Sequence, residues 1–266
     1  MTDAVEVDEV ADGIYRLSAW FPGAAGGRGL TVNQFLLLAD EPMLFHTGLR
    51  SSFPATAAAV DRVVPLDRLR WVSFGHVEAD ECGAMNRYLA AAPHAEVAAG
   101  EVACRVSVAD LADRPPRPLA PGEPLDLGGR RVVAVPTPHA PHNQEAVVLH
   151  EETTGTLLCG DLLTQLGRGP AVTGACLVER VLDAEEVLAA ATPGEAVPAA
   201  LERLAALAPR TLAAMHGSSF EGDGGAALRE LASAWRAWRA GAGEPAPPPP
   251  AAAAPPPGPA ARAAGG

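Results

Sequence analysis

The chain has 266 residues, and its 20 basic residues, all Arg, are outnumbered by 32 acidic ones, which gives a formal net charge of −12. This excess of acid argues against a nucleic acid or an anionic membrane surface as a partner. No apolar run approaches the length that spans a bilayer, so we expect no membrane segment.

One folded domain is expected over residues 1–240. From Gly241 the sequence is almost entirely Pro, Ala and Gly, so 241–266 cannot bury an apolar face and should be a disordered tail. The acidic N-terminus has no apolar core and does not resemble a signal peptide. The four cysteines lack metal-type or framework spacing, so we expect free thiols and a cytoplasmic protein. They are Cys82, Cys104, Cys159 and Cys176.

The N-terminal part predicts a run of antiparallel strands. Apolar and polar residues alternate over 13–20, and 31–38 and 43–48 predict two further strands, with turn residues between the segments. Residues 54–64 then predict a helix. The apolar run 69–74 that follows it predicts a buried strand.

A polar motif follows that buried strand and leads into a helix expected over 84–92. His76, Glu78 and Asp80 alternate, so in an extended segment their side chains project to one side. An imidazole with two carboxylates is a metal-ligand set. The same residues would also suit a solvated loop or the acidic start of a helix. This stretch alone leaves both interpretations open.

The C-terminal part predicts alternating strands and helices, and two sheets covered by helices on their outer faces. A hairpin joins 124–127 to 131–135 through Gly128 and Gly129. Further strands are expected at 95–98, 146–150, 156–161 and 211–215, and helices at 100–108 and 183–191. A capping box at Thr192 and Glu195 predicts a helix that ends at Leu207. The last helix carries an apolar stripe, interpreted as core packing, of Leu228, Leu231, Trp235 and Trp238.

Six candidate metal ligands each follow a strand-like segment: His76, Glu78, Asp80, His142, Asp161 and His216. Only a fold that gathers strand ends at one edge can bring them together. Their order and context resemble the metallo-β-lactamase fold, an α+β, αββα sandwich of two mixed sheets flanked by helices, with a dinuclear metal site at one edge. The resemblance covers most of 10–240. It is carried by 31–36, 137–161 and 215–217.

Within that fold, Glu78 stands where zinc hydrolases have His, which resembles the flavodiiron and oxygen-binding di-iron branch. This resemblance implies two metal ions, with iron favoured and manganese or zinc as alternatives. It implies a first metal held by His76, Glu78, His142 and a bridging Asp161. It implies a second metal held by Asp80, Asp161 and His216.

Two residues depart from the family pattern. Glu81 replaces a His that binds the second metal. A carboxylate also binds hard cations, so Glu81 is a candidate ligand of a second site that is either retained with iron or manganese, or weakened or empty. His46 replaces an Asp before Thr-Gly and is either a ligand-orienting residue or a core histidine. His139 competes with His142 for one ligand position, and the interval to Asp161 favours His142.

Two classes of function follow. A di-iron centre would bind, sense or reduce O₂ or NO. Flavodiiron enzymes hold FMN in a flavodoxin domain for which this chain has no room, so we expect no FMN here, a separate redox partner and, by the same resemblance, a homodimer. Alternatively, a metal-bound water would hydrolyse an ester, thioester or lactone, with Asp80 or Glu81 as general base. A third possible function is that of a binding protein that holds one metal ion or none.

Overall fold

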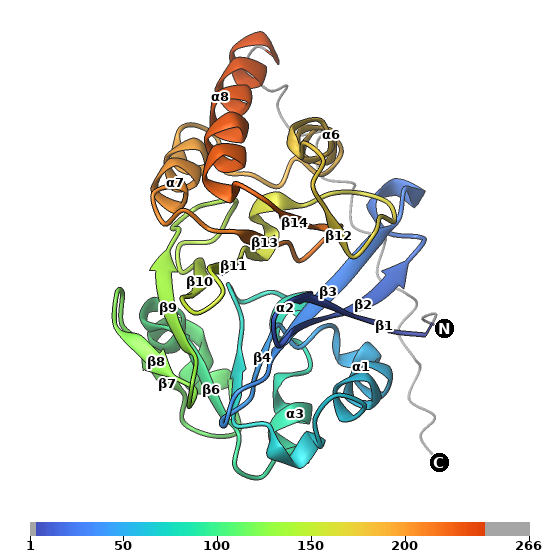
Figure 1. Cartoon of the computed structure of the whole chain (residues 1–266), viewed down its shortest axis with the longest axis vertical. Helices are drawn as coiled ribbons and strands as arrows, with labels where there is room; N and C mark the ends of the chain where they lie inside the picture. Colours follow the sequence, from blue (N-terminus) through green and yellow to red (C-terminus); the bar gives the residue numbers. More distant parts are fainter. Residues whose placement is uncertain (1–3, 243–266) are drawn as a thin grey trace, which may run out of the picture.

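The computed structural model describes residues 4–242. Two mixed seven-stranded sheets pack face to face, with helices on both outer faces (Figure 1). The predicted αββα sandwich is therefore confirmed. The tail expected over 241–266 lies outside the described residues, except that the last helix continues through Ala242. Within the described range, no helix combines the length and apolar character needed to cross a bilayer.

The first sheet keeps its strands in chain order. Its first four strands pair antiparallel, as predicted, and the rest pair parallel. The strands are β1 (Glu6–Ala11), β2 (Ile14–Phe21), β3 (Leu30–Leu37), β4 (Met43–Phe45), β5 (Trp71–Ser73), β6 (Glu96–Gly100) and β7 (Arg117–Leu119). Parallel neighbours need crossover connections. These contain α1 (Phe53–Asp61), α2 (Ala79–Cys82), α3 (Met85–Ala91), α4 (Glu101–Ala103), η4 (Cys104–Val108) and α5 (Ala109–Leu111).

The second sheet has the order β12-β14-β13-β11-β10-β9-β8. Its strands are β8 (Pro124–Asp126), β9 (Arg131–Pro136), β10 (Val147–Glu151), β11 (Thr156–Leu158), β12 (Val172–Thr173), β13 (Thr211–Ala213) and β14 (Ser219–Glu221). The predicted hairpin is the β8–β9 pair. The outer face of the second sheet is covered by α6 (Val178–Leu188), α7 (Ala196–Ala205) and α8 (Gly224–Ala242) (Figure 1).

Three apolar layers hold the sandwich together. The central layer joins side chains of both sheets, such as Phe35 and Phe45 from one and Leu149 and Leu158 from the other. One outer layer packs α1 and α3 on the first sheet, and the other packs α6, α7 and α8 on the second. The predicted stripe of α8 is core, because three of its members are buried. They are Leu228, Leu231 and Trp235.

The expected capping box is wrong. The helix α7 begins at Ala196, and no side chain caps its N-terminus. Thr192 instead donates its backbone N–H to the carbonyl of Pro141, at 2.6 Å. This hydrogen bond ties the α6–α7 connection to the loop before His142. The helix thus begins three residues later than the pattern predicted, with Glu195 at its N-cap.

A buried asparagine joins the two sheets at the edge where the candidate ligands lie. The backbone N–H of Asn33 donates to Met215 O, at 2.9 Å. Its side-chain Nδ2 donates to Ala214 O at 3.0 Å and to Gly217 O at 2.9 Å. These bonds hold both sides of His216, since buried backbone carbonyls require partners. The last candidate ligand is thus fixed relative to β3.

Candidate metal centre

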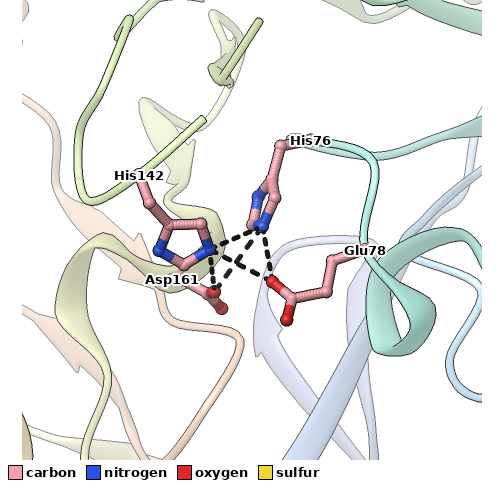
Figure 2. Close-up of side chains that lie close together, drawn as sticks. All are labelled: His76, Glu78, His142 and Asp161. Atoms are coloured by element: carbon pink, nitrogen blue, oxygen red, sulfur yellow. Dashed lines mark hydrogen bonds and ion pairs between the residues drawn. The ribbon is translucent and has the colours of Figure 1, made fainter. Parts of the chain in front are cut away.

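Four donor side chains from separate segments converge at one edge of the sandwich (Figure 2). His76 follows β5, and Glu78 is the residue before α2. His142 lies in the loop between β9 and β10, and Asp161 lies in η5 (Gly160–Leu163), directly after β11. One donor atom from each residue lies within 4.8 Å of all the others. The expected first ligand set is therefore assembled in the fold.

The separations of these donor atoms suit a single cation. His76 Nε2 lies 2.9 Å from Glu78 Oε2 and 3.0 Å from His142 Nε2, and His142 Nε2 lies 3.1 Å from Glu78 Oε2. Asp161 Oδ2 lies 3.9 and 3.7 Å from the two imidazole nitrogens. Bond lengths of about 2.0–2.2 Å place neighbouring ligands of one metal about 3.0–3.5 Å apart. Two lone-pair nitrogens facing each other at this distance require a proton or a cation between them.

Asp161 connects this cluster to a second group of donors. While its Oδ2 faces the first group, its Oδ1 lies 3.1 Å from His216 Nε2. His216 Nε2 in turn lies 3.5 Å from Asp80 Oδ2. His216 Nδ1 lies 2.6 Å from the carbonyl of Thr31, so it donates its proton there and leaves Nε2 free. Burial raises the pKa of Asp80 to about 6.

The carboxylates of the site favour the protonated forms of the histidines beside them. Burial lowers the pKa of His76, but the carboxylates of Glu78 and Glu81 outweigh it and raise the pKa to about 11. Burial likewise lowers the pKa of His216, and Asp161 outweighs it, raising the pKa to about 9. A metal ion would replace these protons, because imidazole binds a metal only in its neutral form.

Glu81 does not lie where the sequence analysis expected it. Its side chain is fully buried, and its carboxylate contacts His46 and His76. Its Oε2 accepts the backbone N–H of His76 at 2.6 Å, and its Oε1 lies 3.1 Å from His76 Nδ1. The carboxylate thus stands behind a candidate ligand. The expected roles of Glu81, as ligand of a second metal and as general base, do not fit this position.

The two departures from the family pattern meet in space. His46 Nε2 lies 3.5 Å from Glu81 Oε1, and both side chains are fully buried. His46 adopts a φ of +66°, a strained conformation for a residue with a Cβ. Burial lowers the pKa of its imidazole. His46 is therefore a buried histidine that contacts Glu81, which in turn contacts His76.

His142 and His139 occupy different surroundings. His139 is exposed, has a φ of +63° and donates its backbone N–H to Asn143 O. His142 belongs to the converging donor group. The geometry thus places His142, not its neighbour, among the candidate ligands.

A cavity of about 230 Å³ opens over the donors. Its polar lining includes Glu78, Asp80, His142, Asp161 and His216 from the candidate ligand set. Its apolar lining comes from Leu30, Leu162, Val181, Leu188 and Trp235. Among the described residues that line it, none is an Arg. These apolar lining residues were not predicted from the sequence. Helix periodicity predicts which face of α6 or α8 is apolar, but it does not predict that this face borders a cavity.

The sandwich and its edge cluster define a metallo-β-lactamase fold with a candidate metal site. The chain belongs to the family described as ODP family beta lactamase, whose model matches residues 30–217. It is also 33% identical over 196 residues to the hydroxyacylglutathione hydrolase of Acidiphilium cryptum (strain JF-5), covering 71% of this chain and 69% of that protein.

Solved structures of similar fold include flavodiiron proteins. The metal-soaked Flv1 flavodiiron core from Synechocystis sp. PCC6803 matches with a TM-score of 0.75 and 24% identity, covering 89% of this chain and 61% of that chain. The rubredoxin oxygen:oxidoreductase of the anaerobe Desulfovibrio gigas matches with a TM-score of 0.73 and 19% identity, covering 86% and 62%. This chain therefore spans about three fifths of those structures, and the likeness establishes the fold.

The ligand assignment predicts different effects for the two neighbouring histidines. His142→Ala should remove most of the bound metal at pH 7, because it deletes one of four converging donors. His139→Ala is the matched control and should retain the wild-type content. Metal per chain is measured by elemental analysis after gel filtration. The opposite pattern would reverse the assignment of the two histidines.

The contact between positions 46 and 81 predicts coupling between their substitutions. Glu81→His would set two imidazoles against each other in a buried space, and His46→Asp would set two carboxylates together. Each single change should therefore destabilise the protein. The double variant restores an imidazole–carboxylate pair and should recover about 0.5–3 kcal/mol relative to the sum of the single losses. Urea unfolding of all four proteins measures the coupling, and strict additivity would show that the two residues act independently.

Proposed function

We propose that this chain is a carboxylate-rich metalloprotein whose two-metal centre, suited to iron, binds O₂ or NO for reduction or sensing. The observation that carries the proposal is the presence of Glu78 in the converging donor group. With Asp161 it gives two carboxylates to two imidazoles. Mixed imidazole and carboxylate ligation favours iron or manganese and is used by di-iron proteins.

The chain's own residues supply two adjoining positions. His76, Glu78, His142 and Asp161 would hold one ion, and the second carboxylate oxygen of Asp161 would be shared with the other. The remaining ligands of the second ion would be Asp80 and His216. Bound iron would supply the electrons and the open coordination position that a diatomic ligand needs. Because Glu81 contacts His46 and His76 instead, the second ion would have fewer protein ligands than the first.

The cavity supports a small uncharged ligand. Its volume of about 230 Å³ is below the roughly 300–1,000 Å³ of pockets for larger organic ligands. The rest of its lining is mostly apolar, and Glu185 adds a further carboxylate. An anionic ligand would find no Arg or Lys side chain among the described lining residues. O₂ and NO are small enough for this volume and carry no charge that would need a basic side chain.

Ester, thioester or lactone hydrolysis is the second candidate, favoured by the 33% identity to a hydroxyacylglutathione hydrolase. A metal-bound water would then be the nucleophile. Asp80, which lines the cavity, is placed to accept a proton, whereas buried Glu81 is not. The acid-lined cavity suits a neutral lactone or ester better than an anionic glutathione thioester. A separate electron donor and a homodimer belong only to the di-iron proposal, by its resemblance.

The two candidates separate in a paired assay on iron-loaded protein prepared without O₂. We expect NO to produce the electron paramagnetic resonance signal of an iron–nitrosyl species. We also expect the protein either to consume O₂ when a reductant is supplied, or to bind O₂ stably. Hydrolysis of lactoylglutathione should stay near the metal-free background. His142→Ala should lose the NO signal, and His139→Ala should keep it. Rapid thioester hydrolysis with no response to NO would instead establish the hydrolase.

A further inference from the structure

The side chain of Glu81 occupies a site built around it. A Cβ placed on Gly75 would lie 3.2 and 3.3 Å from its two carboxylate oxygens. A Cβ on Gly160 would lie 3.3 Å from Oε1, and that glycine has a φ of +54°. Both approaches are tighter than ordinary van der Waals contact, so larger residues would press on the carboxylate. Gly75 and Gly160, two residues after the ends of β5 and β11, thus leave space for it.

Both oxygens of Glu81 are directed at His76. Oε2 accepts the backbone N–H of His76 at 2.6 Å. Oε1 lies within hydrogen-bonding distance of His76 Nδ1, at 3.1 Å, and the next ring nitrogen is His46 Nε2 at 3.5 Å. Among the described residues, Oε1 has no hydrogen-bond partner, so the ring Nδ1 of His76 is the nearest group that could donate to it. The carboxylate is therefore free to accept a hydrogen bond from the Nδ1–H group of His76.

We propose that Glu81 is a positioning residue that holds His76 in the tautomer and orientation needed to bind a metal through Nε2. A proton kept on Nδ1 leaves the Nε2 lone pair directed at Glu78 and His142, the other donors of the group. Carboxylates that hold a ligating histidine in this way also strengthen it as a ligand. His46 in turn contacts Glu81, with its Nε2 3.5 Å from Oε1. This inference rests on the proposed metal centre but not on the reaction carried out there.

An isosteric amide at position 81 would disrupt this arrangement. A glutamine has one acceptor oxygen, whereas His76 presents two donors, its backbone N–H and its Nδ1–H. If the amide oxygen takes the backbone N–H, the amide NH₂ faces Nδ1 and favours the tautomer with the proton on Nε2. That tautomer cannot bind a metal through Nε2. Glu81→Gln should therefore weaken metal binding while preserving the size of the side chain.

Glu151 provides a matched control. It is also fully buried, and its carboxylate accepts the backbone N–H groups of Thr153 at 2.8 Å and Thr154 at 2.9 Å. It lies at the far end of β10 from Val147, whose N–H bonds to Gly75 beside the site. Glu151→Gln removes a comparable buried charge without touching the candidate ligands. It reports the general cost of such a substitution.

The experiment titrates Mn²⁺ into wild type, Glu81→Gln and Glu151→Gln, and measures free Mn²⁺ by electron paramagnetic resonance, with melting temperatures recorded in parallel. We expect Glu81→Gln to raise the Kd of the first Mn²⁺ by about 10–100-fold. Glu151→Gln should lower the melting temperature but leave that Kd within about twofold of wild type. A folded Glu81→Gln protein with a wild-type Kd would overturn the inference.

A second measurement needs only the wild type and decides the matter if Glu81→Gln does not fold. In protein loaded with diamagnetic Zn²⁺, ¹⁵N correlation spectra of the histidine rings should show His76 with its proton on Nδ1 and the metal on Nε2. A proton on Nε2, or metal bound through Nδ1, contradicts the inference. A wild type that binds neither Mn²⁺ nor Zn²⁺ contradicts the metal centre itself, which separates that failure from a failure of this inference alone.

Discussion

The central constraint on this protein is the close packing of acidic and imidazole groups around Asp161. Its two carboxylate oxygens face different histidines, His76 and His142 on one side and His216 on the other. These groups come from loops far apart in sequence, so they meet only because the two sheets place their strand ends at a common edge. Such a cluster is stable when protons or cations balance its charge. The fold thus assembles an arrangement that a metal ion would complete.

Support for this arrangement comes from behind the donors. Glu81 and His46 form a buried contact against His76, and Asn33 bridges the two sheets beside His216. Buried polar groups are costly unless they are paired, so their presence in an otherwise apolar interior indicates that they fix a geometry. The strained backbone of His46 is consistent with that reading, since a positive φ is retained where surrounding contacts enforce it.

Much of this structure could be predicted from the sequence, because it depends on local patterns. Short apolar runs bounded by turn residues predicted most strands, and the polar residues that follow them predicted the candidate ligands. The direction of a side chain could not be predicted in this way. Glu81 sits one position after Asp80 in α2, yet it turns to the interior because His46 and His76 receive it there. Thr192, expected to cap α7, lies three residues before the observed N-cap and donates its backbone N–H to the distant carbonyl of Pro141. Both outcomes depend on segments distant in the chain.

The measurement that tests the account most directly is elemental analysis of the protein purified without O₂ and without chelator, with absorption spectra before and after O₂ is admitted. The account predicts about two iron ions per chain, as in di-iron carboxylate proteins, and a near-ultraviolet band that changes with O₂. One colourless zinc ion per chain, with spectra indifferent to O₂, would contradict it. The carboxylates of Glu78 and Asp161 would then serve a hydrolytic site.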